Sequence, residues 1–159
     1  MMENHSHAPP GYQCPFCLLL NKIENDQVYS RHSDIVYQDD RVTAFVASHQ
    51  YKGNWPNILV IPNEHYENVY ELPAAYGTDI HNGVKKVALA LKAVYNCDGI
   101  STRQHNESAG SQDVWHYHMH VTPRFNKDRF YLRASFSRAF MPLEQRKLLA
   151  DKLKIFLTK

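Results

Sequence analysis

Three histidines stand at every second position in one short segment of the chain, as His116, His118 and His120. The alternation predicts a β-strand over residues 114–122, in which successive side chains point to opposite faces. The three imidazoles would then share one face. Imidazole is a nitrogen nucleophile and a proton carrier near neutral pH. The row could therefore supply a nucleophile, an orienting partner and an anion ligand, and the alternative is one metal ion bound by all three histidines.

Polar side chains flank this histidine segment. Asn106 and Gln112 lie in the loop before it, where Gly110 and Ser111 also offer accessible backbone N–H groups as donors to an oxyanion. Arg124 follows the segment, where a guanidinium can meet a phosphate, although simple solvation at the surface explains it equally well. The loop and the histidines together form a candidate anion-binding site.

Two cysteines near the start of the chain, Cys14 and Cys17, have a spacing that directs two thiolates at one metal ion. A tetrahedral zinc site would need two more ligands. A glutaredoxin-type redox motif is the competing interpretation, but such a motif follows a buried strand, whereas a polar, proline-rich segment precedes this one. Two unrelated reduced cysteines are a third possibility. The remaining cysteine, Cys97, is interpreted as a small packing residue.

Short strands and two helices are expected to position these residues. Strand patterns precede the histidine segment at residues 35–37, 42–46, 57–61 and 100–103. Apolar residues at three- and four-residue intervals predict one long helix between about Pro73 and Tyr95. A second helix is expected to begin at Pro142 and to carry Leu149, Leu153 and Phe156 on one stripe. The pattern predicts an α+β fold with a mostly antiparallel sheet of about five strands.

Composition favours one ordinary globular domain. The chain has 159 residues, of which 43% are hydrophobic and 21% charged. Residues 1–13 are expected to form a mobile tail and residues 14–159 a single domain. A net charge of +2 without a basic block argues against nucleic acid as a partner. The lack of a long apolar run or a secretory signal argues against a membrane, and a cytoplasmic location is expected.

The segment from His116 to Thr122 resembles the signature of the histidine-triad (HIT) family, His-apolar-His-apolar-His-apolar-apolar, with Tyr117 and Thr122 as mild departures. Further segments share the resemblance: residues 39–41, 44–45, 59–62 with His65, and 106–112. It implies a HIT-like fold and a nucleotidyl hydrolase or transferase that is usually a homodimer.

The resemblance also implies residue roles. His118 would attack the α-phosphate of a nucleoside phosphate ester, anhydride or phosphoramidate and form a covalent nucleotidyl-histidine, which water then releases as the nucleoside monophosphate. His120 would contact the phosphate oxygens, with Gln112 and Asn106 as amide donors around them. The loop can also be aligned with His105 in the place of Asn106.

Some bacterial HIT proteins, and the related galactose-1-phosphate uridylyltransferases, resemble this chain in their cysteine pattern. That resemblance implies a zinc site made of Cys14, Cys17, His65 and His116. Because all four ligands would come from the protein, the Zn²⁺ would be structural and would not activate water.

Two positions depart from the family pattern. Ala47 stands where Hint-type members carry an aspartate that binds the ribose hydroxyls. Asp113 stands where Hint-type and Fhit-type members carry serine or threonine near the phosphate, and a carboxylate there would repel phosphate unless it is turned away. The expected substrate is therefore a nucleotide-like phosphorus centre, with no assigned ribose contact.

The leading hypothesis is a HIT-type hydrolase that cleaves a phosphoramidate, a phosphoanhydride or a dinucleoside polyphosphate. A nucleotidyltransferase or phosphorylase would use the same intermediate and pass the nucleotide to phosphate or a sugar phosphate. The third hypothesis is a nucleotide-binding protein with little turnover, because a fold can persist while its chemistry fades. The intact His118 argues against it.

Overall fold

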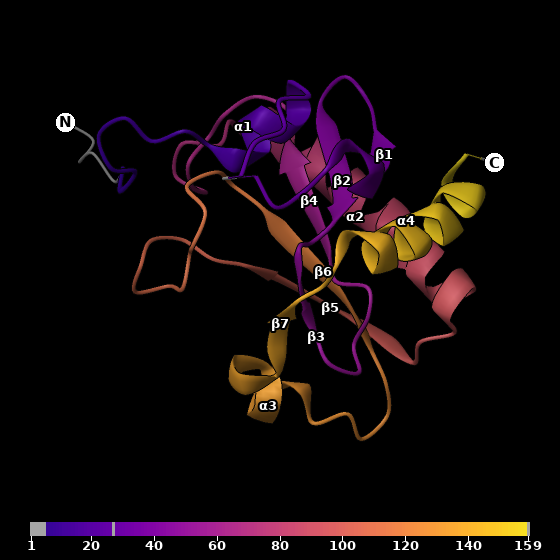
Figure 1. Cartoon of the computed structure of the whole chain (residues 1–159). Coiled ribbons are helices and arrows are strands. Elements are labelled where there is room, and N and C mark those ends of the chain that lie inside the picture. The colour runs from indigo at the N-terminus through magenta and orange to yellow at the C-terminus, as the bar shows by residue number, and fades with distance from the viewer. Residues whose placement is uncertain (1–5, 27, 159) are drawn as a thin grey trace.

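The computed structural model describes residues 6–26 and 28–158 (Figure 1). Its centre is an antiparallel sheet with the strand order β1-β2-β4-β6-β5. The strands are β1 (Ile35–Gln38), β2 (Val42–Val46), β4 (Ile58–Pro62), β5 (Gly99–Gln104) and β6 (Met119–Arg124). The predicted α+β class with a sheet of about five antiparallel strands is confirmed.

Two helices cover one face of this sheet, α2 (Ala74–Tyr95) and α4 (Leu143–Leu157) (Figure 1). The residues preceding them are Pro73 and Pro142, as predicted. The helix α2 lies so close to β4 that a Cβ at Gly83 would come within 3.1 Å of the Val60 side chain. Leu149 and Leu153 face the core, whereas Phe156 of the predicted stripe is 40% exposed.

The opposite face is covered only in part, by the short helix α1 (Pro15–Leu20). Its buried side chains Phe16 and Leu19 lie in a second core cluster with Phe45 of β2 and Leu59 of β4. Alternate residues of β2 and β4 therefore meet α1 on one side and α2 on the other. The uncovered part of this face carries the histidines.

Besides α1, four further elements were not predicted. They are the 3₁₀ helix η1 (His32–Asp34), the strands β3 (His49–Tyr51) and β7 (Arg138–Phe140), and the helix α3 (Phe130–Ser137). The strands β3 and β7 form a separate antiparallel ribbon, which lies with α3 at the end of the molecule away from α1 (Figure 1). This ribbon brings the far end of the chain to the edge of the histidine face.

Residues 6–13 of the expected tail lie against the domain. The Ser6 hydroxyl and the backbone N–H groups of His7 and Ala8 donate to the carboxylate of Glu67. The His7 ring is stacked on Trp115. Residues 1–5 of that tail are outside the described residues, and its mobility stays a prediction.

No helix in the described part of the chain is both long enough and apolar enough to cross a membrane.

Candidate functional site

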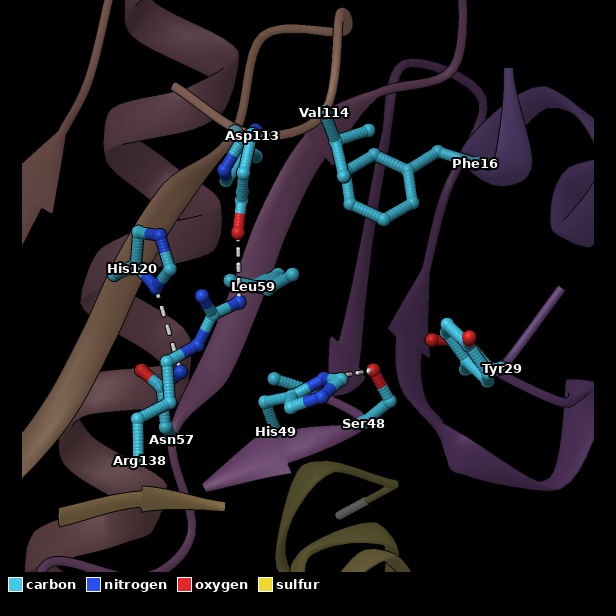
Figure 2. Close-up of a pocket in the computed structure, with 13 residues that line it drawn as sticks. Phe16, Tyr29, Ser48, His49, Asn57, Leu59, Asp113, Val114, His120 and Arg138 are labelled. Carbon is cyan, nitrogen blue, oxygen red and sulfur yellow. Dashed lines mark hydrogen bonds and ion pairs between the residues drawn. The ribbon is translucent and has the colours of Figure 1, made fainter. Parts of the chain in front are cut away.

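A cavity of about 210 Å³ opens on the partly covered face of the sheet (Figure 2). His118 and His120 line it beside Asn57 and Leu59, which belong to the segment leading into β4 and to β4 itself. The helix α1 contributes Phe16 as an apolar wall. Segments far apart in the sequence thus meet around two of the three histidines.

The third histidine lies on the same face of the sheet, as predicted, but outside this cavity. β6 is shorter than predicted and begins only at Met119, and the N–H of His116 donates to the carbonyl of Val114 at 2.9 Å. Tyr117, Met119 and Val121 nevertheless pack in the core on the opposite face, and the Phe16 ring contacts both His118 and His116. The His116 ring is fully buried and faces Cys14 and Cys17.

His118 is buried with one ring nitrogen fixed. Its Nδ1 lies 2.7 Å from the carbonyl oxygen of His116, which can only accept, so Nδ1 carries the proton and donates. The lone pair of a neutral ring is then on Nε2. Burial lowers the pKa of His118, which keeps the ring neutral near pH 7. This tautomer is the one that a nitrogen nucleophile requires.

His120 has the opposite tautomer, set by Asn57. The Thr122 hydroxyl donates to Asn57 Oδ1 at 2.9 Å, which turns the Asn57 amide nitrogen towards His120 Nδ1 at 3.3 Å. An imidazole that accepts at Nδ1 carries its proton on Nε2. Burial, together with the neighbouring His118, lowers the pKa of His120 well below its usual value. His120 is thus a neutral N–H donor, as a phosphate contact needs.

The carboxylate of Asp113 is engaged by an arginine from the far end of the chain. Arg138 of β7 lies 2.8 Å from it, and both line the cavity (Figure 2). The ion pair offsets the charge that would repel a phosphate. Arg138 was missed in the sequence because only the β3–β7 pairing brings it to this site.

The two predicted amide donors do not line the cavity. Gln112 donates to the carbonyls of Glu67 and Val114 and accepts from the N–H of Glu107. Asn106 binds the N–H of Val69 and the side chain of Gln104. Both amides hold the loop in shape, and direct contact with phosphate stays a prediction.

Other residues considered from the sequence take different places. His105 lines a second cavity, which His120 also lines. Arg124 donates to Asp128 at 2.7 and 2.8 Å and lines neither of the two cavities. Around Ala47, the first cavity is lined by Tyr29, Ser30, Ser48 and His49.

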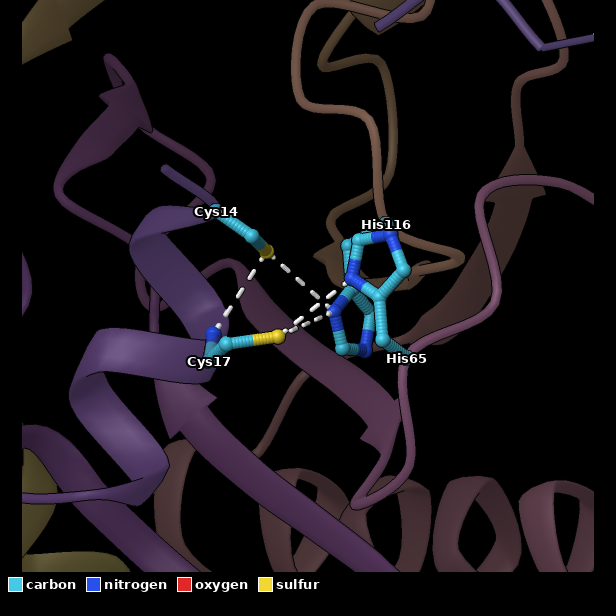
Figure 3. A group of neighbouring side chains, drawn as sticks. All are labelled: Cys14, Cys17, His65 and His116. Atoms are coloured by element: carbon cyan, nitrogen blue, oxygen red, sulfur yellow. Dashed lines mark hydrogen bonds between the residues drawn. The ribbon is translucent and has the colours of Figure 1, made fainter. Parts of the chain in front are cut away.

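Four side chains gather beside the segment that precedes β6: Cys14, Cys17, His65 and His116 (Figure 3). Their candidate ligand atoms all lie within 4.8 Å of one another. Cys14 Sγ is 3.3 Å from His116 Nδ1, and Cys17 Sγ is 3.3 Å from His65 Nδ1. A tetrahedral zinc with ordinary bond lengths separates sulfur and nitrogen ligands by about 3.6 Å. The four residues therefore fit one ion after small shifts.

The hydrogen bonds of this cluster also suit a metal. His116 Nε2 lies 3.0 Å from the carbonyl of Pro62 and donates to it, which leaves the Nδ1 lone pair facing the two sulfurs. Contact with the Cys14 thiol and with the imidazoles of His116 and His65 lowers the pKa of Cys17, so one thiolate is available, whereas contact with Cys17 and burial raise the pKa of Cys14. The predicted ligand set is brought together by the fold.

The sheet, the two long helices and the paired histidines define a histidine-triad type of domain. The HIT domain family model matches residues 29–127, and the chain belongs to the HIT family. The Protein hit of Bacillus subtilis is 39% identical over 93 residues, which are 58% of this chain and 62% of that protein. The match thus spans less than two thirds of that relative. An adenylylsulfatase of Arabidopsis thaliana is 25% identical over 87 residues, 55% of this chain and 44% of that protein.

Solved structures show the same fold over nearly the whole chain. A Hit-like protein involved in cell-cycle regulation from Bartonella henselae has a TM-score of 0.72 and 27% identity, with 91% of this chain and 98% of that chain covered. A zinc-bound histidine triad family protein from Mycobacterium smegmatis has a TM-score of 0.69 and 22% identity, covering 91% and 93%. At 22% identity, the similarity to the Mycobacterium smegmatis protein concerns the fold alone.

Proposed function

We propose that this chain is a nucleotide hydrolase in which His118 forms a covalent nucleotidyl intermediate. The hydrogen bond from His118 Nδ1 to the His116 carbonyl carries the proposal, because it leaves Nε2 as a free nucleophile at the cavity. The adenylylsulfatase among the relatives is consistent with a reaction at a nucleotide phosphorus. The substrate class is a phosphoramidate, a phosphoanhydride or a dinucleoside polyphosphate.

In the first step the Nε2 lone pair of His118 forms a bond to phosphorus, and the bond from phosphorus to the leaving group breaks. The leaving group takes the electron pair, with a proton where it is a basic amine. The imidazolium that develops on His118 keeps its hydrogen bond to the His116 carbonyl. His120 donates from Nε2 to a non-bridging oxygen, where negative charge accumulates.

In the second step water attacks phosphorus, the bond to His118 Nε2 breaks, and the nucleoside monophosphate leaves. The side chains of Asn57 and Thr122 keep His120 in its donating tautomer throughout. The predicted contacts of Gln112 and Asn106 with phosphate are kept in the proposal as contacts made after substrate binds.

Zinc is proposed as the occupant of the four-residue cluster, held by Cys14, Cys17, His65 and His116. A zinc-bound relative of the same fold supports the choice. When bound, the ion would supply a closed structural cross-link between α1 and the segment before β6. His116 would then be fixed through its ring, and its carbonyl would orient His118.

The function is tested by intact mass spectrometry after mixing the protein with a panel of nucleotide anhydrides and phosphoramidates. We expect wild-type protein to gain the mass of one nucleotidyl group and to release nucleoside monophosphate, and His118→Ala to do neither. His81→Ala is the matched control, because His81 is exposed on α2. Labelling that persists in His118→Ala would refute the assignment.

The other two hypotheses give different outcomes in the same assay. Nucleoside diphosphate formed when inorganic phosphate is supplied would identify a phosphorylase. Nucleotide that binds without cleavage or labelling would identify a binding protein.

The metal site is tested by the zinc content of purified protein. Wild type should hold close to one zinc per chain, and the double variant Cys14→Ser/Cys17→Ser should hold almost none. Cys97→Ser is the control, because Cys97 is buried in the main core, outside the cluster. Equal zinc in the double variant and the wild type would end the proposal.

A homodimer and a cytoplasmic location are also proposed. The described strand β5 pairs only with β6, which leaves its other edge available to a second copy. Light scattering should give the mass of two chains. A reducing compartment would keep Cys14 and Cys17 reduced and able to bind a metal.

A further inference from the structure

Arg103 stands beside the phosphate-contacting histidine on the same face of the sheet. It is the register partner of His120 between β5 and β6. Directly opposed residues on neighbouring antiparallel strands have Cβ atoms about 5 Å apart and share a face. The family signature does not include this position, and the function proposed above assigns it no role.

No carboxylate meets the Arg103 guanidinium among residues 6–26 and 28–158. Its Nη2 donates to the Tyr51 hydroxyl at 3.0 Å, and its Nε is buried without a hydrogen-bond partner in the described structure. The guanidinium carbon is 4.9 Å from the centre of the Phe130 ring. By contrast, Arg124 on the neighbouring strand is fully engaged by Asp128. The charge of Arg103 therefore has no counter-ion among the described residues, and an anion would meet it at its Nη groups.

The available space adjoins Arg103. A second cavity, of about 360 Å³, is lined by Arg103, His105, Ser111, Tyr131 and Arg138, and it reaches His120. His120, Asp113 and Arg138 line both cavities, so the two cavities adjoin at these residues. Because Asp113 is paired with Arg138, the charge of Arg103 is left unbalanced there.

His118 lines the first cavity but not the second. Attack on phosphorus is in line, so the leaving group departs on the side opposite the nucleophile. A phosphorus atom between His118 and His120 would therefore direct its leaving group past His120 towards Arg103. An anion bound there would contact the Arg103 guanidinium and the Ser111 hydroxyl.

We propose that this second cavity binds an anionic leaving group, phosphate or polyphosphate, with Arg103 as its main ligand. The inference rests on the proposed function and assigns this cavity to those of its substrates that are nucleotide anhydrides. As the His118 Nε2–phosphorus bond forms, the phosphorus–oxygen bond breaks and its electron pair stays on the departing phosphate oxygen. Arg103 meets the charge of that oxygen, and no proton is required.

The first test measures binding of inorganic tripolyphosphate by calorimetry at fixed ionic strength. Loss of a charge-assisted hydrogen bond should weaken binding roughly 10- to 100-fold in Arg103→Met, which keeps an apolar stem against Phe130. Arg129→Met is the control for net charge, because Arg129 is exposed and lines neither cavity. Arg103→Gln replaces Arg103→Met if the latter does not fold. Unchanged binding in the Arg103 variant would overturn the proposal.

The second test compares two substrates that share a nucleoside, one an anhydride with a phosphate leaving group and one a phosphoramidate of a neutral amine. In Arg103→Met, kcat/KM should fall at least tenfold for the anhydride and stay within about twofold for the phosphoramidate. Equal losses would make Arg103 a structural residue. Weaker tripolyphosphate binding with both rates unchanged would identify a site for free anions and overturn the leaving-group role.

Failure of the proposed function and failure of this inference give different results. If the proposed function is wrong, wild-type protein will cleave neither substrate and His118 will carry no adduct, and the leaving-group assignment will be wrong as well.

Discussion

A buried ion pair joins the C-terminal helix α4 to the wall of the first cavity. Arg146 of α4 and Asp34 of η1 are 1% and 0% exposed in their side chains, and they lie 3.1 Å apart. Arg146 also donates to the carbonyl oxygens of Met141 at 2.6 Å and Tyr29 at 2.7 Å. Because Tyr29 lines the cavity, this one guanidinium connects the stability of the fold to the shape of the site.

Replacing Arg146 with methionine should lower the free energy of unfolding by about 3–5 kcal/mol, since it leaves the Asp34 carboxylate buried without a counter-ion. Asp34 would retain the N–H of Arg31 as a hydrogen-bond donor. Urea unfolding at pH 7, followed by circular dichroism, measures the loss. Lys154→Met on the same helix is the control, because Lys154 is about one third exposed and pairs with Asp151 near solvent. The expected loss there is below about 1 kcal/mol.

The loss should also depend on pH. Burial already raises the pKa of Asp34, and removal of Arg146 raises it further. A carboxyl whose folded pKa exceeds its unfolded pKa, about 3.9, binds more protons when folded, so its contribution to stability declines as pH rises between the two values. The free energy of unfolding of Arg146→Met should therefore be closer to that of wild type at pH 4 than at pH 7. A loss below about 1 kcal/mol, or one equal to that of Lys154→Met, would refute the role of the buried pair.

Three further perturbations test the site and its supports. Thr122→Val should lower kcat roughly three- to tenfold by freeing the Asn57 amide to turn, and nitrogen NMR should show His120 gaining the Nδ1–H tautomer. Asp128→Asn should lower the free energy of unfolding by about 2 kcal/mol at pH 7. Arg124 lowers the pKa of Asp128, so its stabilisation is present above its unfolded pKa and declines in acid, and the difference between variant and wild type in urea should shrink below about pH 4. Removing the proposed zinc with a chelator should lower kcat, and Co²⁺ should restore it as well as Zn²⁺ does, because the ion would serve only as a cross-link.

Local patterns predicted most of the central fold. The helix α2 lies where the helical period of its apolar residues placed it, and β1, β2, β4 and β5 lie where short runs of β-branched and apolar residues did. Among the elements that were missed, α3 and the β3–β7 ribbon have no such pattern. Leu132 and Phe136 of α3 are each 77% exposed, so the helix shows no buried apolar stripe that a sequence pattern could reveal.

The sequence predicted some residues of the candidate site and missed others. The spacing predicted His118 and His120, and the resemblance to relatives predicted the proposed metal ligands. Asn57 was missed because a buried amide that sets a tautomer carries no pattern of its own. Arg138 and Arg103 were missed because their roles depend on strand pairing across long stretches of sequence.

The position of His116 explains how the two halves of the site depend on each other. All three histidine rings lie on one face of the sheet, but only His118 and His120 line the cavity. The His116 ring faces the cysteines while its carbonyl accepts from His118 Nδ1. A single residue therefore contacts the proposed metal cluster through its side chain and the proposed nucleophile through its backbone. An ion bound in that cluster would in this way affect the chemistry, by holding the carbonyl that keeps His118 Nε2 free.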